Sequence, residues 1–583
     1  MTKAQINNKY VLGNKIEILF DFINKGVHYQ LDDQQIFILG NPIIDGKINF
    51  EKIRKKIIHD NFNQDFIKKI DGEFLIIIYR SDFNLLIVND RFSSIPLYYS
   101  IVKNKFIISP NFLTLFKKID KKSLNHEKFM EFLYFQRLHG ENTYESSIKS
   151  MNSASIIEYN FKKVVSKKYW FQDYKKDHSL SIYDYAKKLS ELIFESINSK
   201  LSDFNHRNNF GLFLSGGMDS RTVLGSFKKF RPIAFTLGFS KLGEYRVSRK
   251  ISKIISNEHD FIKLQKEYFS KNFKRLIHIS SGLYRFDHGI FCGIKNQISD
   301  KVKVVFNSTA LDYWFQGYYI PKTNIKIFGK PTYYNNIRKQ NGFFEDDYFY
   351  NIPYRFKKNN PLDYIKSNKS SFITSYIKNE VKKIYELGIN NGCYNFYDCW
   401  DYILNDNISR HFSYFNNLSM HDSCEPRTIA FYNRIFDLFL KIPIEYRFNA
   451  KVSKETLKIV NYKFSKVISA NHGMKITGSP FEMTMHTIFR KIASQFSSSK
   501  QFRHPVASDR TWPDPYSYLK GNKFLFKKAE DLKKSEYLDM AMPYLDRDKL
   551  NKDIDSWLFN SIDGGDILYR LITINEFLKQ GYK

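Results

Sequence analysis

The segment FGLFLSGGMDS, residues 210–220, constrains the fold of this chain more than any other feature. Its first part, Phe210–Leu214, has the length and apolar composition of a buried strand. Gly216 and Gly217 then permit a tight turn, and residues 221–228 follow with a helical pattern. The sequence therefore predicts a strand, a glycine turn and a helix, a unit typical of α/β folds.

Strand–helix alternation continues on both sides of this unit. Residues 233–237 and 302–306 are apolar runs of strand length, and residues 182–200 and 244–256 repeat apolar side chains at helical spacing. Strands that are apolar throughout are typical of parallel sheets buried on both faces. The sequence thus predicts a doubly wound parallel sheet, followed by a largely helical extension to residue 583.

The first third of the chain has a different pattern of predicted secondary structure. Short β-rich runs cover residues 74–79, 85–88, 97–102 and 106–109, and a further hairpin is expected within residues 155–170. Only a few polar or turn residues separate these runs, so they predict an antiparallel meander.

The polar stretch DYKKDHSLS, residues 173–181, is the expected domain boundary. It divides the chain into a first domain, residues 1–172, and a second domain, residues 182–583. Two or more domains are expected at this length, because single hydrophobic cores stop growing beyond about 250–300 residues.

Composition and charge narrow the choice of function. The chain is 43% hydrophobic and has no run of about 18 apolar residues, so we expect a folded, cytoplasmic protein with no membrane partner. The first ten residues, MTKAQINNKY, lack the apolar stretch of a signal peptide. A net charge of +31 would suit nucleic acid. The lysines are scattered rather than gathered on one face, so a nucleic-acid partner is not expected.

The SGGMDS residues suit a bound phosphate. The glycine turn lets backbone N–H groups approach an anion, and the N-terminus of the following helix adds positive potential. Ser215 and Ser220 supply hydroxyl donors, and the carboxylate of Asp219 needs a cation beside phosphates, a role that Mg²⁺ fills. S-G-G alone could be an ordinary strand–helix turn. The whole motif in this context predicts a site for ATP and magnesium.

S-G-G-x-D-S also resembles the signature of the ATP pyrophosphatase (PP-loop) superfamily, whose members cleave ATP between the α- and β-phosphates and adenylate a carboxyl or carbonyl group. Two other stretches resemble asparagine synthetases. Residues 420–443 resemble their synthetase half at Glu425 and Arg427. Residues 71–99 resemble their amidotransferase half, with Ser94 in place of a glycine and matches at Asp71, Gly72, Phe74, Asp90, Arg91, Pro96, Leu97, Tyr98 and Tyr99.

This resemblance implies an α/β fold of two parts. The first is an antiparallel αββα domain of the Ntn-hydrolase type, and the second is a PP-loop synthetase domain. Thiolation and lysidine-forming members of the superfamily lack such a first half, which argues against tRNA modification. The resemblance leaves a homodimer open.

The resemblance also assigns site residues. Asparagine synthetases read S-G-E-G-x-D-E after the third strand, where this chain reads NSTALDY at residues 307–313. Thr309 stands at the catalytic glutamate and cannot be a strong base, so the proton acceptor stays open. Lys454 matches the catalytic lysine, with Lys451 and Lys458 as rivals. Asp219 and Asp312 match the metal ligands, and ATP would contact Leu214, Ser215, Gly216, Gly217, Asp219, Ser220, Leu237, Gly238 and Ser308.

The amidotransferase nucleophile is missing. Glutamine-dependent members begin Met-Cys-Gly and use the exposed cysteine, whereas this chain reads Met1-Thr2-Lys3 and has its first cysteine at Cys292. We expect a first half that does not hydrolyse glutamine, with Thr2 as an alternative nucleophile. The amine would then be ammonia or a substrate amino group, as in the related β-lactam synthetases and lasso-peptide cyclases.

Three functions stay open. The first is an AMP-forming amide ligase that adenylates a small-molecule or peptide carboxylate, either an asparagine synthase-like enzyme or a tailoring ligase acting on a peptide or a polysaccharide component. The second is an ATP-binding relative without catalysis, which Thr309 and the lost glycines would suit. The third is a nucleic-acid enzyme, suggested only by charge and the loop.

Overall fold

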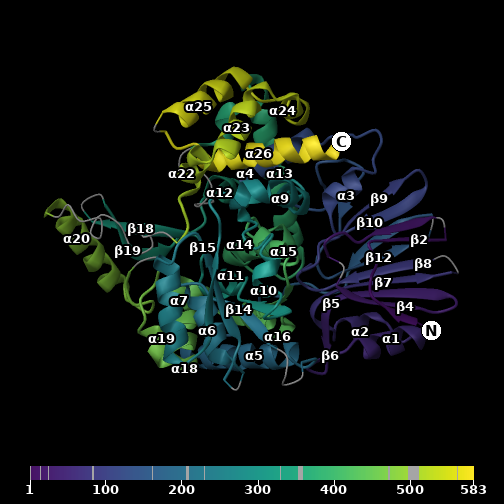
Figure 1. Cartoon of the computed structure of the whole chain (residues 1–583), viewed down its shortest axis with the longest axis horizontal. Coiled ribbons are helices and arrows are strands. Elements are labelled where there is room, and N and C mark those ends of the chain that lie inside the picture. Colours follow the sequence, from purple (N-terminus) through teal and green to yellow (C-terminus); the bar gives the residue numbers. More distant parts are fainter. Residues whose placement is uncertain are drawn as a thin grey trace.

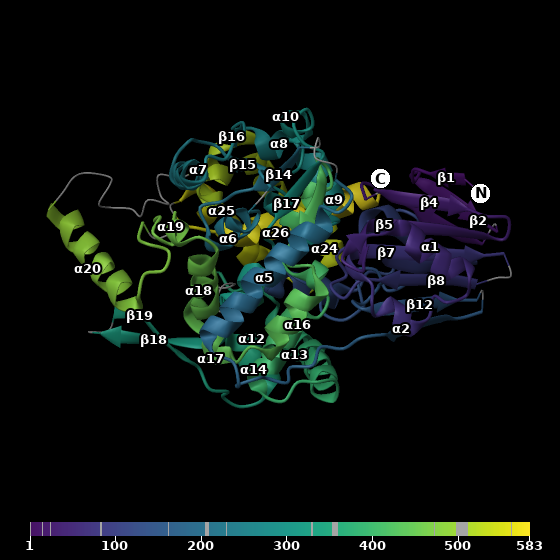
Figure 2. The ribbon, with the colours of Figure 1, turned by 90° about the horizontal axis from the view of Figure 1, so that it is seen from below.

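The computed structural model describes residues 2–13, 15–23, 25–81, 84–160, 162–204, 209–228, 230–327, 330–351, 359–470, 473–496, 511–560 and 562–583. The N-terminal sheets lie at one end of the molecule, a parallel sheet lies in the middle, and a projecting arm lies at the other end (Figures 1 and 2). Within these ranges no helix combines the length and the apolar character needed to cross a membrane.

Two sheets stack in the N-terminal half. All their strand pairs are antiparallel except β3 with β10. The first sheet runs in the order β1 (Thr2–Ala4), β4 (Gly26–Gln30), β5 (Gln34–Ile44), β7 (Asp71–Arg80), β8 (Asn84–Asn89), β12 (Ser155–Tyr159) and β13 (Val164–Lys168), with β6 (Lys47–Ile48) beside β5. The second runs β11 (Lys149–Ser150), β9 (Tyr98–Val102), β10 (Lys105–Ser109), β3 (Ile16–Leu19) and β2 (Lys9–Leu12).

Alternation along β7 builds the layers. Leu75 and Ile77 belong to the core shared with the second sheet. Ile76 and Ile78 point the opposite way, as the two-residue period of a strand requires, into a core with α1 (Phe50–Ile58) and α2 (Gln64–Ile67). The second sheet is covered in turn by α3 (Phe112–Phe116). The predicted αββα arrangement is confirmed.

The prediction of one meander is wrong. Strands β7 and β8 lie in the first sheet, but β9 and β10 lie in the second. The chain changes sheets at a turn organised by the buried Asp90, whose carboxylate accepts N–H groups of Phe74, Phe92 and Ser94 at 2.9, 2.8 and 3.1 Å. Short spacing between strands did not reveal this crossing.

The second half contains a five-stranded sheet in which every pair is parallel. This confirms the doubly wound prediction. Strand β16 was not expected, and β20 occupies part of a region expected to be helical. The order is β16 (His259–Lys263), β15 (Ile233–Gly238), β14 (Phe210–Phe213), β17 (Val304–Asn307) and β20 (Glu425–Thr428).

Helices cover this sheet and extend it. Helices α5, α6 and α18 pack against one another. The helices are α5 (Ile182–Lys200), α6 (Met218–Ser226), α7 (Gly243–Ile254), α8 (Tyr268–Lys271), α9 (Phe273–Ser280), α10 (Lys295–Ile298), α11 (Leu311–Phe315), α12 (Phe344–Asn351), α13 (Ser367–Asn390), α14 (Phe396–Asn405), α15 (Phe415–Met420), α16 (Asn433–Lys441), α17 (Ile444–Arg447), α18 (Lys451–Val460) and α19 (Tyr462–Ser465). Helix α4 (His126–Phe135) belongs to the first half of the chain and contacts α13.

Two further parts complete the fold. The arm consists of the hairpin β18 (Lys322–Ile327) and β19 (Lys330–Ile337) with α20 (Pro480–Phe496). The C-terminal helices lie at the top of Figure 1, and α26 packs on the N-terminal half through Phe577, whose ring lies 5.0 Å from that of Phe116. These helices are α22 (Pro515–Gly521), α23 (Lys523–Asp531), α24 (Glu536–Ala541), α25 (Arg547–Phe559) and α26 (Gly565–Gly581).

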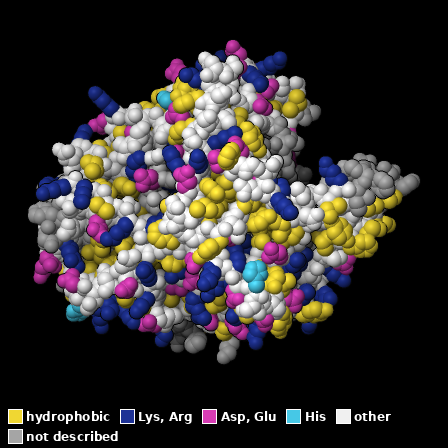
Figure 3. Space-filling view, turned by 180° about the vertical axis from the view of Figure 1, so that it is seen from behind, with side chains coloured by type: hydrophobic (Ala, Val, Ile, Leu, Met, Phe, Trp, Pro, Cys, Tyr) yellow, Lys and Arg dark blue, Asp and Glu magenta, His cyan; other side chains and the backbone are white. Residues whose placement is uncertain are grey.

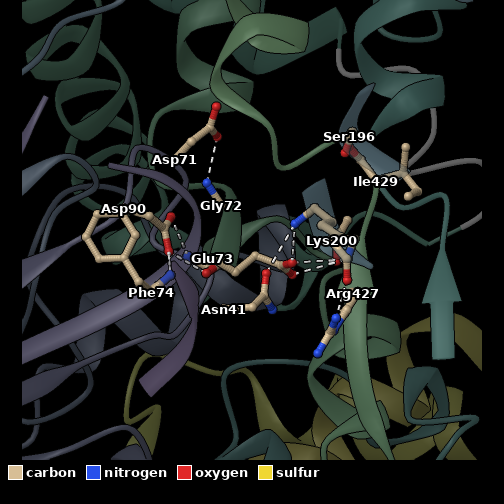
Figure 4. A network of polar contacts seen from close by, with 12 residues as sticks. Asn41, Asp71, Gly72, Glu73, Phe74, Asp90, Ser196, Lys200, Arg427 and Ile429 are labelled. Atoms are coloured by element: carbon tan, nitrogen blue, oxygen red, sulfur yellow. Dashed lines mark hydrogen bonds and ion pairs between the residues drawn. The ribbon is translucent and has the colours of Figure 1, made fainter. Parts of the chain in front are cut away.

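The two stretches that resemble asparagine synthetases meet at the boundary between the sheets (Figure 4). Lys200 from α5 donates to Glu73 of β7 at 2.9 Å, and Glu73 also accepts the N–H of Thr428 in β20 at 3.1 Å. Arg427 donates to the carbonyl of Lys200. Because these groups are buried, each charge needs its partner. The resemblance at Asp71–Phe74 and Glu425–Arg427 therefore marks an interdomain contact.

Candidate active site

A cavity of about 330 Å³ opens at the carboxyl ends of β14, β15 and β17. The chain runs outward from β14 through β15 to β16 on one side and occupies β17 and β20 on the other, so the strand order reverses here. Ligands of open α/β sheets bind at such a switch point. Of the predicted site residues, the cavity is lined by Leu214, Ser215, Asp219, Ser220, Leu237, Ser308, Thr309 and Asp312.

The glycine loop after β14 is held by its own serines. The backbone N–H of Ser215 donates to Ser220 Oγ at 3.1 Å, and that of Gly217 donates to Ser215 Oγ at 3.1 Å. A Cβ on Gly216 would lie 2.4 Å from the Cβ of Ala470, so only glycine fits there. Gly217 is the N-cap of α6 without a side-chain cap. The loop thus has the open helix N-terminus that suits an anion.

Arg221 holds this loop through hydrogen bonds to its carbonyls, and no sequence motif indicated this role. Its fully buried guanidinium donates to the carbonyls of Gly216 and Gly217 at 2.7 and 3.0 Å. It also donates to the carbonyls of Val467 and Ile468 at 2.9 and 2.8 Å. One side chain therefore ties the loop to the segment that follows α19.

Two carboxylates share the cavity. Burial raises the pKa of Asp219, and burial together with the charge of Asp219 raises the pKa of Asp312. Gln316 Nε2 donates to both carboxylate oxygens of Asp219. Mg²⁺ is usually held by one or two carboxylates, with waters and substrate phosphates. The pair fits that ion, and in the described ranges no larger group of His, Cys, Asp and Glu could hold a metal.

The end of β15 forms another wall of the cavity, beside Leu237. A Cβ on Gly238 would lie 2.1 Å from Thr511 Cγ2, so this glycine permits close packing rather than facing the cavity. Next to Thr511, Trp512 lines the cavity and donates from Nε1 to Glu244 at 3.1 Å. Trp512 and Glu244 lie 268 residues apart in sequence, and no motif marked either of them.

Another part of the cavity lining contains Thr309, Tyr313, Ser413 and Asn416. The N–H of Thr309 donates to Asn307 Oδ1 at 3.0 Å. The hydroxyls of Tyr313 and Ser413 are hydrogen-bonded to each other. This wall is polar, so it can orient a second substrate against a nucleotide held by the loop.

Lys454 is not among the residues that line the cavity. Its ammonium donates to the carbonyl of Gly478 at 3.2 Å. Burial lowers the pKa of Lys454, and the neighbouring charge of Lys458 adds to this effect. The geometry therefore leaves Lys454, a residue of α18, bonded to the segment that leads to α20.

The N-terminal half offers no thiol. None of residues 1–291 is a cysteine, and Cys292, Cys393, Cys399 and Cys424 are all free and buried. The side chain of Thr2 lies outside the described part of the structure.

The fold and the cavity define a two-domain protein with an amidotransferase-like sheet domain and a PP-loop domain. Two family models match in this order. Residues 56–170 match the glutamine amidotransferase domain, and residues 188–465 match asparagine synthase. The chain belongs to the asparagine synthetase family.

Named relatives agree with the family at low identity. A protein of Methanocaldococcus jannaschii provisionally named asparagine synthetase (glutamine-hydrolyzing) 2 is 26% identical over 45% of this chain and 52% of its own length. Asparagine synthetase (glutamine-hydrolyzing) 1 of Bacillus subtilis is 24% identical over 35% of this chain and 34% of its own length. The chain therefore spans about half of the first relative and a third of the second.

A solved structure of NMN synthetase from Francisella tularensis covers 42% of this chain and 97% of its own length at 16% identity. Its TM-score of 0.18 is too low for a comparison of folds.

Proposed function

We propose that this chain is an ATP-dependent ligase that adenylates a carboxylate and transfers the acyl group to ammonia or an amine. The observation that best supports this proposal is that Asp219 and Asp312 line one cavity, together with the loop that leads to the uncapped N-terminus of α6. Names of the relatives and the asparagine synthase match support amide formation with ATP.

The proposed reaction has two steps. A substrate carboxylate oxygen attacks the α-phosphorus of ATP, and the bond to the β-phosphate oxygen breaks to release pyrophosphate. The amine nitrogen then attacks the acyl carbon, AMP leaves with the electron pair of the acyl–oxygen bond, and the nitrogen loses a proton. The loop N–H groups of Gly216 and Gly217 would bind phosphate oxygens, and Ser308 and Thr309 would orient the acyl group.

Bound magnesium would neutralise charge on the pyrophosphate, and Asp219 and Asp312 are the residues that would hold it. Gln316 would keep the carboxylate of Asp219 oriented. Lys454 is proposed to contact the α-phosphate after the Gly478 segment moves. The test compares turnover in Lys454→Met with turnover in the control Lys458→Met. We expect only Lys454→Met to be slower than the wild type.

The amine source is proposed to be ammonia or a substrate amino group. This follows from the absence of cysteine among residues 1–291, which removes the thiol that glutamine hydrolysis uses in this family. Glutamate release from glutamine by the purified protein would overturn this part. A tailoring ligase acting on a peptide or polysaccharide component is favoured by Thr309 at the position of the catalytic glutamate.

The deciding experiment measures pyrophosphate and AMP from ATP with a panel of carboxylates and ammonia. We expect release that requires one carboxylate and is lost in Asp219→Ala, whereas the exposed control Asp45→Ala retains it. ATP binding without turnover in any combination would contradict the ligase and indicate an ATP-binding relative without catalysis.

A further inference from the structure

The arm exposes an apolar face of helix α20 to solvent. Helix α20 turns Thr484 inward, where its hydroxyl accepts the N–H of Tyr333 from β19 at 3.2 Å and only 9% of the side chain is exposed. The adjoining face of the helix is apolar and open to solvent. The exposed fractions there are 60% for Phe481, 48% for Met485, 45% for Ile488, 64% for Phe489 and 50% for Ile492.

These five residues recur at helical spacing, so they form one stripe, which we call the arm stripe. Figure 3 shows hydrophobic side chains gathered on the projecting arm. A contiguous exposed patch of this kind marks an interaction site rather than a core. Helix α20 also lies beyond residue 465, where the asparagine synthase match ends.

Charge narrows the choice of partner. Among the arm side chains that the structure describes, the exposed Lys322 and Lys326 stand against the single acidic residue Glu482. Two copies of the arm brought together would place like charges side by side, which costs free energy. The arm stripe therefore suits an acidic partner better than a second copy of this chain.

The hairpin adds an open backbone edge. Residues 322–326 of β18 are all exposed, and in the described structure β18 pairs with β19 alone. An extended polypeptide can pair with such an edge through main-chain hydrogen bonds. A lipid surface offers no such donors and acceptors, so the edge favours a polypeptide.

The arm is joined to the cavity at several points. Strand β18 follows α11, which carries Asp312. The segment entering α20 passes Gly478, where Lys454 is bonded, and the described chain resumes at Thr511, next to Trp512 of the cavity. The chain thus connects the arm directly to elements that line the cavity.

We propose that the arm docks an acidic polypeptide that also carries apolar side chains, as a macromolecular carboxylate substrate. The docking itself stands on the arm stripe, the charges and the β18 edge. Only the step from docking to reaction rests on the proposed function, because the carboxylates of the bound polypeptide would be the groups that are adenylated.

The test measures fluorescence anisotropy of a labelled 16-residue peptide of alternating Glu and Leu. We expect binding that weakens at high salt, and weaker binding when the peptide has Gln for Glu or Ser for Leu. The triple variant Phe481→Ser, Ile488→Ser and Phe489→Ser should lose at least tenfold in affinity. The control Phe372→Ser with Phe559→Ser, which removes exposed rings of 52% and 61% outside the arm, should bind as the wild type does.

A second variant, Lys322→Glu with Lys326→Glu, tests charge without touching the arm stripe and should also weaken binding tenfold. Equal affinity of the wild type and both arm variants overturns the proposal. So does arm-dependent binding of phosphatidylcholine–phosphatidylglycerol vesicles without peptide binding, or a dimer that only the triple variant abolishes.

Asp219→Ala separates the two levels of the proposal. It should bind the peptide normally while failing to release pyrophosphate. If the wild type binds the peptide and releases no pyrophosphate with any carboxylate, the ligase proposal fails and the docking surface stands. If turnover occurs with small carboxylates and no peptide binds, the docking proposal alone fails.

Discussion

The side-chain amide of Gln316 donates to both carboxylate oxygens of Asp219, each at 2.8 Å. Gln316 is the C-cap of α11, the helix that carries Asp312. One short helix therefore supplies both the second carboxylate of the cavity and the group that orients the first. A residue that holds a metal-binding carboxylate in place is expected to affect metal affinity without touching substrate.

We predict that Gln316→Ala weakens the affinity for Mg²⁺, raising the Mg²⁺ concentration that gives half-maximal pyrophosphate release about tenfold. The reason is that Asp219 loses its orienting donor while both carboxylates remain. A magnesium titration at saturating ATP measures this effect. Gln340→Ala, in an exposed loop, is the matched control. An unchanged titration in Gln316→Ala would assign the amide a role in packing alone.

Arg221→Met is expected to destabilise the glycine loop. The variant removes buried charged donors from the carbonyls of Gly216, Gly217, Val467 and Ile468. Hydrogen bonds to charged groups contribute about 1.5–3 kcal/mol each, and the carbonyls left behind would be unpaired. The midpoint of thermal unfolding should fall by several degrees and ATP affinity should fall with it.

The control for this change is Arg231→Met, since Arg231 is exposed and donates to the nearby carbonyls of Lys228 and Phe230. If Arg221→Met kept the thermal midpoint and the ATP affinity of the wild type, Arg221 would not be needed to hold the glycine loop.

Local signals predicted the nucleotide half well. Helix α5 begins and ends as expected because Ser181 and Asp184 form a capping box before an apolar stripe. Strand β14 and the loop after it were found because an apolar run, two glycines and a helix follow in order. These features depend on neighbours in sequence, so sequence reveals them.

Long-range features were missed for a physical reason. The segment EPRT of β20 has no strand pattern, and it is a strand because its backbone pairs with β17. Trp512, Ser413 and Arg221 reach the site or its loop through tertiary contacts that no motif encodes. Lys454 shows the converse, since a matching motif did not bring its ammonium into the cavity lining.

A buried charge cluster between α4 and α13 predicts acid sensitivity. His139 Nδ1 lies 2.7 Å from Glu131, and Lys128 lies 2.6 Å from Glu131 and from Glu380. Burial lowers the pKa of His139 to about 4. Burial alone would raise the pKa of Glu131, but Lys128 and His139 outweigh it and hold that pKa well below its usual range.

Both shifts act in the same direction. In the unfolded chain His139 takes up a proton near pH 6.5, so between pH 6.5 and 4 the unfolded state binds more protons and stability falls as pH falls. Glu131 extends this loss below its unfolded pKa. We predict that His139→Asn flattens the pH dependence of the thermal midpoint between pH 6.5 and 4, whereas the exposed control His59→Asn leaves it unchanged. The same slope in both variants would place the acid sensitivity elsewhere.

Trp512 should report on nucleotide binding. Its indole lines the cavity while its Nε1 is held by Glu244, and a base that stacks on an aromatic ring gains about 1–3 kcal/mol. We predict that ATP changes the tryptophan fluorescence of the wild type and that Trp512→Phe loses this change. Trp512→Leu, which has no ring for a base to stack on, should bind ATP about tenfold more weakly, as about 1.4 kcal/mol implies. Trp170→Phe, at the edge of the N-terminal half, is the control and should keep both. If Trp512→Phe retained the full signal, the nucleotide base would have to lie away from the β15 end of the cavity, and the assignment of Leu237 and Gly238 to ATP would fall with it.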